Sequence, residues 1–147
     1  MPLPTFIFIL LFFTHQNNNN SALQDHIGVT IKQENKMQIK VNGKVFDVRL
    51  ENNITSKELQ KRLPLQLNMK DLNSNEKFIY LDTGLPENPT NVNNINIGDI
   101  MLYGDNCIVI FYKSFNTTYQ YTRIGKIVNP EGLESVLGKG SVQLDFQ

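Results

Sequence analysis

The stretch GDIMLYGDNCIVIFYKSF, residues 98–115, is the most apolar part of the chain outside its N-terminus. It predicts two strands, Ile100–Tyr103 and Cys107–Lys113, joined around a Gly-Asp-Asn turn at residues 104–106. Consecutive apolar residues place apolar side chains on both faces of each strand, so both faces need to be covered. A hairpin of this kind belongs at the centre of a barrel or sandwich, and this expectation decides the fold class.

A second hairpin is predicted where MQIKVNGKVFDVRL, residues 37–50, alternates apolar and polar positions around Asn42-Gly43. Asn-Gly suits the two-residue type I′ turn because both of its central residues need a positive φ. Apolar, β-branched and aromatic residues predict further strands at 65–69, 76–81, 118–128 and 140–146.

Two short helices are expected among these strands. A capping box of Thr55 and Glu58 would open the first helix, which Pro64 ends. The second helix would have Asn129 as its N-cap, with Pro130 at its first position and Gly138 past its end. The fold class predicted is therefore mainly β: a small closed β-barrel of about eight strands with two short helices.

The N-terminal region divides into a leader and a linker. Residues 1–16 contain an apolar run, 6–13, that is too short for a stable membrane span and fits the hydrophobic region of a signal peptide. This predicts a secreted or periplasmic protein. The alternative is a cytoplasmic protein whose translation starts at Met37. Residues 17–36 form an Asn-rich linker, and residues 37–147 form the domain.

Composition excludes several classes of function. The chain has 14 basic and 14 acidic residues, and this balance argues against nucleic-acid binding. Both histidines precede Met37, and Cys107 is the only cysteine. The domain therefore lacks the Ser-His and Cys-His pairs of nucleophilic enzymes and the ligands of a zinc site. We predict no catalytic residue, no metal and no cofactor, and we interpret Cys107 as a core residue.

A ligand pocket is predicted at the barrel mouth, where strand ends bring aromatic and charged residues together. Its occupant would be a small ligand or a peptide. Arg123 lies between tyrosines and could bind an anionic group with two parallel hydrogen bonds. Alternatively Arg123 pairs with Glu76, which would make both residues structural, or Glu76 serves as a general base. The predicted site residues are Arg123, Tyr103, Phe111, Tyr80, Tyr121 and Glu76.

Several motifs occur in a fixed order: LPLQLNM, NEKFIYL, GDIMLYGDNCIVIFYKSF, YTRIGKI and GLESVLGKGSVQLDF. Together they resemble an uncharacterised, mostly bacterial family of cyclophilin-like proteins, from about residue 37 to the C-terminus. The resemblance implies a cyclophilin-like β-barrel and carries no established activity. Members of that family occur behind signal sequences or beside flavodoxin-like domains. An accessory role with a flavodoxin-like redox partner is therefore one alternative function.

Prolyl isomerase activity is the other alternative. The resemblance to cyclophilins suggests it, but their Phe-His-Arg-like pattern is missing here, and so are the tryptophan and histidine of their proline pocket. A divergent isomerase would use Arg123 as its polar donor. Shared fold does not imply shared function, so a binding module without catalysis is the first hypothesis.

Overall fold

The computed structural model describes residues 35–147. The predicted leader and all but the last two residues of the predicted linker lie outside the described residues. Within 35–147, no helix is both long enough and apolar enough to cross a membrane.

The predicted Asn-Gly hairpin is confirmed as strands β1 (Lys36–Val41) and β2 (Lys44–Leu50). Asn42 and Gly43 both have a positive φ, 47° and 80°, as a type I′ turn requires. Every second residue of both strands is buried, so the hairpin turns one apolar face to the core and one polar face to solvent.

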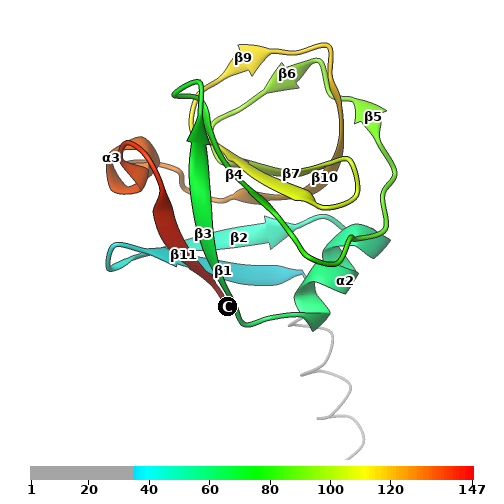
Figure 1. The fold of residues 1–147 in the computed structure, drawn as a ribbon, viewed down its shortest axis with the longest axis horizontal. Coiled ribbons are helices and arrows are strands. Elements are labelled where there is room, and N and C mark those ends of the chain that lie inside the picture. Colours follow the sequence, from blue (N-terminus) through cyan, green and yellow to red (C-terminus); the bar gives the residue numbers. More distant parts are fainter. Residues whose placement is uncertain (1–34) are drawn as a thin grey trace, which may run out of the picture. The chain divides into compact units, whose positions relative to one another are not determined.

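Eight antiparallel strands close into the predicted barrel (Figure 1). The order around the barrel is β2-β1-β11-β3-β4-β8-β7-β10, and β10 pairs back with β2. The remaining six strands have these bounds: β3 Leu65–Leu72, β4 Glu76–Tyr80, β7 Asp99–Tyr103, β8 Cys107–Phe111, β10 Gln120–Ile127 and β11 Val142–Phe146.

Two contacts between distant parts of the chain complete the barrel. β11 lies between β1 and β3, and the backbones of Gln38 and Gln147 exchange hydrogen bonds of 2.8 and 2.9 Å. β10 crosses β2 closely at Gly125, where a Cβ atom would lie 2.7 Å from the carbonyl oxygen of Arg49. Only glycine allows this approach, which follows an irregularity in the β10 register after Arg123.

Helix α2 (Ile54–Lys61) begins at a different cap from the one predicted. Asn53 is the N-cap, and its side-chain oxygen accepts a 2.9 Å hydrogen bond from the Ser56 amide. Thr55 is instead buried inside the first turn, where its hydroxyl donates to the carbonyl of Pro86 at 2.6 Å. The capping-box prediction was wrong because Thr55 finds this tertiary acceptor and Asn53 caps the helix two residues earlier.

Helix α3 (Leu133–Leu137), in contrast, starts later than predicted. Its N-cap is Gly132 with φ 78°, and Asn129 accepts a 3.4 Å hydrogen bond from the Glu131 amide in the turn before it. Gly138 ends the helix as predicted. Leu133 and Leu137 are buried against the barrel core, and Figure 1 shows α2 and α3 on opposite sides of the barrel.

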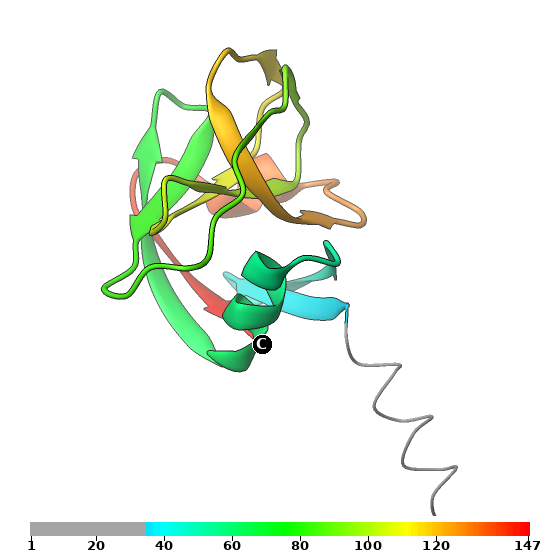
Figure 2. The same ribbon diagram turned by 90° about the vertical axis from the view of Figure 1, so that its right-hand side faces the viewer.

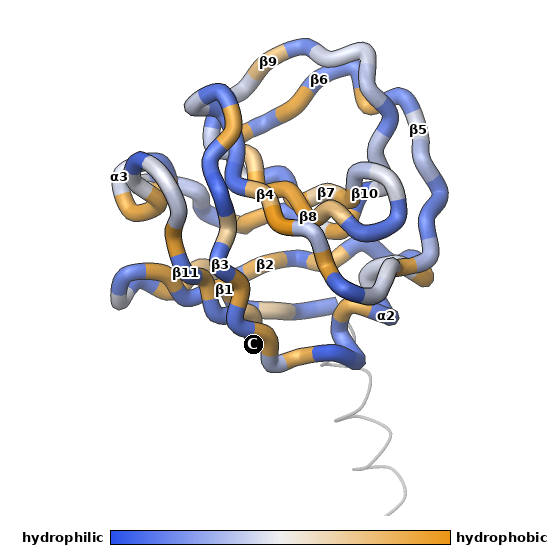
Figure 3. Tube along the Cα trace, viewed as in Figure 1, coloured by the Kyte–Doolittle hydropathy of each residue, from blue (hydrophilic) through white to orange (hydrophobic). Residues whose placement is uncertain are grey.

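The β7–β8 hairpin is covered on both faces, as its sequence predicted. Ile100, Leu102, Ile108 and Ile110 belong to the cluster that fills the barrel. Met101, Cys107, Val109 and Phe111 belong to a second cluster on the outer face. Figure 3 shows β7 and β8 as a mainly hydrophobic part of the trace.

Three two-residue strands help to cover that outer face: β5 (Thr90–Asn91), β6 (Asn94–Ile95) and β9 (Phe115–Asn116). β5 pairs with β10, and β6 pairs with β9. Figure 2 shows the long segment between β4 and β7 running along the outside of the barrel to reach the β6–β9 pair. We call the face of β4, β8, β7 and β10 beneath these segments the outer face.

Candidate functional site

All six predicted site residues lie on this outer face. Cross-strand partners share a face of a sheet, and the register pairs Glu76 with Phe111 and pairs Cys107 with both Tyr80 and Tyr103. Arg123 lies opposite Met101, two positions before Tyr103, and Tyr121 lies two positions before Arg123. Both helices contribute buried leucines to the cluster that fills the barrel, whereas Phe111 and Tyr121 belong to the second cluster on the outer face. The predicted residues therefore lie on the outside of the barrel wall and not in its mouth.

Aromatic rings form a connected series on the outer face. Phe111 contacts Phe115 and Tyr121, with ring centroids 5.7 and 5.6 Å apart. Tyr103 contacts Tyr121 at 5.6 Å and Tyr119 at 6.0 Å. Phe111 and Tyr121 are buried, whereas Tyr103 and Tyr119 are 46% and 63% exposed, so the series runs from the second core to the surface.

A pocket of about 460 Å³ opens beside the buried end of this series. It lies between the β3–β4 turn and the segment that joins β9 to β10. Its lining includes Leu72, Asn75, Glu76, Phe115, Tyr119 and Tyr121. The volume falls within the range of about 300–1,000 Å³ that is typical of small-molecule sites.

Among residues 35–147, Glu76 is the only acidic or basic residue that lines this pocket. Its side chain is half-buried, and within residues 35–147 its carboxylate has no hydrogen-bond partner and no ion pair. Burial, with a smaller contribution from Asp71, raises the pKa of this carboxyl above its usual range. The pocket therefore holds a carboxylate whose charge the described protein does not match.

Burial and the charge of Glu76 also raise the pKa values of two nearby groups. Burial, with the charge of Glu76, raises the pKa of Tyr121 to about 12 and that of the Cys107 thiol to about 11. Cys107 is 5% exposed. It is therefore protonated at neutral pH, and its prediction as a core residue is confirmed.

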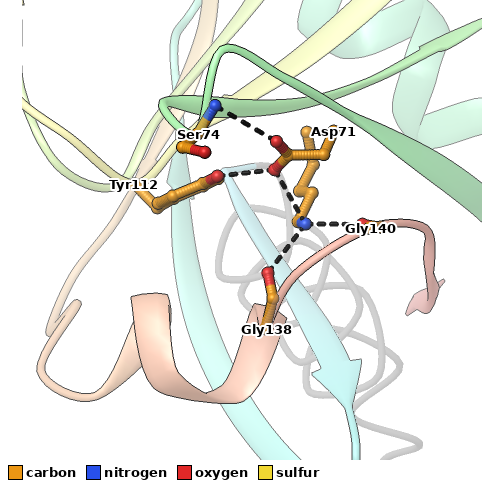
Figure 4. Close-up of polar contacts among 6 residues, drawn as sticks. Asp71, Ser74, Tyr112, Gly138 and Gly140 are labelled. Carbon is orange, nitrogen blue, oxygen red and sulfur yellow. Dashed lines mark hydrogen bonds and ion pairs between the residues drawn. The ribbon is translucent and has the colours of Figure 1, made fainter.

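Sequence reasoning missed a polar cluster on the inner face of β4, the strand that carries Glu76 on its outer face. Lys77 is completely buried, and its ammonium group donates to Asp71 Oδ1 at 2.9 Å and to the carbonyls of Gly138 and Gly140 at 2.9 and 2.6 Å. The Tyr112 hydroxyl donates to the same Asp71 oxygen at 2.5 Å. Figure 4 shows these groups converging between β3 and the end of α3. All three ammonium protons have acceptors, which is the condition for burying a lysine.

The Asp71 carboxylate also has hydrogen-bond partners at both of its oxygens. Its second oxygen accepts a 3.1 Å hydrogen bond from the Ser74 amide. The hydroxyl of Tyr112, with a smaller contribution from Lys77, lowers the pKa of Asp71 below its ordinary value of 3.8. Burial and the bond to Asp71 raise the pKa of Tyr112 well above its ordinary value. We therefore assign the Lys77–Asp71–Tyr112 cluster to structure: it ties β3, β4 and the α3–β11 connection together.

Of the six predicted site residues, Glu76 and Tyr121 line this pocket, and Arg123, Tyr80, Tyr103 and Phe111 do not. Arg123 is exposed and forms no ion pair with Glu76 in the described part of the chain, so the alternative that paired them is wrong. Its backbone carbonyl accepts a 2.7 Å hydrogen bond from the Asn53 side chain. Tyr80 is 63% exposed and lines a different hollow near Arg62. Their roles in ligand binding stay predictions.

A metal centre has no support in the described part of the chain. No group of three or more His, Cys, Asp or Glu side chains there could hold an ion. The pocket's chemistry thus consists of one carboxylate, aromatic rings, and the amides and hydroxyls of asparagine and threonine.

The fold and the ordered motifs together define a class of small antiparallel barrels, and comparison with known families agrees. The family model described as the cyclophilin-like family matches residues 39–147. This chain belongs to that family. None of the curated proteins matches it.

Proposed function

We propose that this protein binds a small ligand or a peptide in the pocket that contains Glu76. The observation that carries this proposal is the half-buried Glu76 carboxylate without a partner, facing a pocket of about 460 Å³. Partial burial of a charge costs free energy, which a partner can offset. No fully buried side-chain oxygen or nitrogen lacks a hydrogen-bond partner in residues 35–147, so the unpaired Glu76 oxygens are reachable from the solvent side. A carboxylate left unpaired beside a hollow is therefore a good indicator of a place that a ligand completes.

The surroundings of Glu76 support binding. Tyr121, which lines the pocket, is buried in the second hydrophobic cluster on the outer face. Tyr119 at the rim is mostly exposed and offers a large aromatic surface. A buried aromatic side chain in the wall and an exposed one at the rim are typical of ligand sites, which combine apolar walls with a few polar groups.

The test is a binding screen on the full chain, followed by nuclear magnetic resonance. Uniformly labelled protein is titrated with a mixture of small organic fragments and short blocked peptides. We expect chemical-shift changes that concentrate on residues 72–76 and 115–121. Changes confined to other surfaces would contradict the proposal.

A blocking variant makes the screen specific. Thr118 is exposed and lines the pocket, so Thr118→Trp places an indole ring in the hollow and should abolish binding. Val128 is 65% exposed and is not among the residues that line this pocket. Val128→Trp adds the same ring elsewhere and should leave binding unchanged. Equal binding by both variants would move the site away from this pocket.

A further inference from the structure

The charges around the pocket indicate the sign of its ligand. None of the described residues that line the pocket is lysine or arginine, and Glu76 supplies the only formal charge among them. The nearby Asp71 carboxylate is matched by Lys77 on the other face of the sheet. A bound anion would therefore meet repulsion, whereas a cation would find an unmatched carboxylate.

The aromatic rings in the pocket favour an organic cation over a metal ion. Phe115, Tyr119 and Tyr121 line the same pocket as Glu76. Aromatic faces attract organic cations, most strongly where water is excluded. A divalent metal ion would need several oxygen ligands, and no cluster of acidic or metal-binding side chains exists in residues 35–147.

From these two observations we infer that the ligand carries a cationic nitrogen, an ammonium or guanidinium group, that pairs with the Glu76 carboxylate beside these rings. The inference rests on the proposed function and specifies its ligand class. Pairing supplies the partner that Glu76 lacks within the described chain. The cation is either a free amine or the side chain of a lysine or arginine in a peptide, and the experiment below distinguishes these sources.

The experiment compares probes that differ in one charge. Blocked lysine, N-acetyl-lysine N-methylamide, is titrated beside its uncharged counterpart made from norleucine, which keeps the aliphatic chain. Two further probes are n-butylamine and a blocked peptide, Gly-Gly-Lys-Gly-Gly. Each is added at low salt to the labelled full chain, and dissociation constants are taken from the shifts of residues 72–76 and 115–121.

Two variants with the same net charge complete the design. Glu76→Gln keeps the size of the side chain and removes its charge. Glu87→Gln removes a charge from an exposed residue outside the pocket. Thermal unfolding of both variants verifies that they fold.

We expect blocked lysine to bind at least about tenfold more tightly than the norleucine probe, the usual scale for a hydrogen bond to a charged group. Glu76→Gln should remove that difference, and Glu87→Gln should keep it. A peptide that binds more tightly than n-butylamine supports a peptide ligand, and equal affinities support a free amine. Equal binding of the lysine and norleucine probes, or an unchanged preference in Glu76→Gln, overturns the cationic ligand while the pocket remains a binding site. If no probe or fragment binds there, the proposed function fails with it.

Discussion

Glu76 and Lys77 are consecutive residues on β4, and their side chains lie on opposite faces of the sheet. Lys77, inside the barrel, has an acceptor for each of its three protons. Glu76, on the outer face, has no partner within residues 35–147. Complete pairing indicates a structural role, because nothing is left for a ligand to contact. Incomplete pairing beside a pocket indicates a binding role.

Replacing Lys77 should have the largest effect on stability. Lys77→Met leaves the Asp71 carboxylate and the carbonyls of Gly138 and Gly140 without their shared donor. Removing one partner of a buried ion pair costs about 3–5 kcal/mol, and we expect the free energy of unfolding in urea to fall by about 3 kcal/mol. Lys70 is exposed, so Lys70→Met should change it by less than about 0.5 kcal/mol. Similar losses of stability in the two variants would contradict the structural role assigned to Lys77.

Replacing Asp71 should have an intermediate effect that depends on pH. The folded-state pKa of Asp71 is lowered, so its contribution to stability is present above about pH 3.8 and is lost as the pH falls through the folded value. Asp71→Asn removes the charge but keeps a side-chain oxygen as an acceptor, and Lys77 keeps the carbonyls of Gly138 and Gly140. The variant should therefore lower the free energy of unfolding by about 1–2 kcal/mol at pH 7. The difference from wild type should shrink at pH 3, measured by urea unfolding at each pH. A difference independent of pH would contradict the assignment.

Removing the Tyr112 hydroxyl should cause a smaller loss of stability than replacing Lys77 or Asp71. Tyr112→Phe keeps the buried ring and deletes the 2.5 Å hydrogen bond to Asp71. A typical loss is about 1 kcal/mol, measured as a lower urea midpoint with an unchanged slope. As a control, Tyr119→Phe alters an exposed ring and should have no effect on stability. An unchanged stability in Tyr112→Phe would mean that Lys77 and the Ser74 amide hold Asp71 without the hydroxyl.

Glu76→Gln should have the smallest effect and the opposite sign. The folded-state pKa of Glu76 is raised, so the folded protein loses stability as the pH rises from about 4.5 through that value. Because about half of the side chain stays in water, which screens its charge, the variant should be more stable than wild type by only about 0.5 kcal/mol at pH 7, with little difference at pH 4. Urea unfolding at the two pH values measures this. A loss of stability at pH 7 would show that Glu76 has a structural partner.

Much of the barrel could be predicted from local patterns. The Asn42-Gly43 turn and the two-faced apolar hairpin of β7 and β8 follow from φ requirements and alternation alone. The helix starts could not be predicted, because Thr55 bonds to Pro86, 31 residues away. Local capping preference is weak beside such a tertiary hydrogen bond.

The candidate site was predicted in part. Glu76 and Tyr121 were named from sequence and line one pocket, whereas Asn75 and Tyr119 were not named. Lys77 was missed because lysine is almost never fully buried without partners, and two of its three acceptors, the carbonyls of Gly138 and Gly140, lie more than 60 residues away in the sequence. One signal was available: in EKFIY, Lys77 alternates with Ile79 on the inner face.

The place of β11 between β1 and β3 has a consequence for folding during synthesis. β1 is among the first strands of the domain to leave the ribosome, but its second neighbour emerges about a hundred residues later. Until then the edges of β1 and β3 stay unpaired, and the barrel cannot close. Such nonlocal pairing slows folding and exposes strand edges to other chains. A nascent chain of this protein therefore depends on its last strand to hide both edges at once.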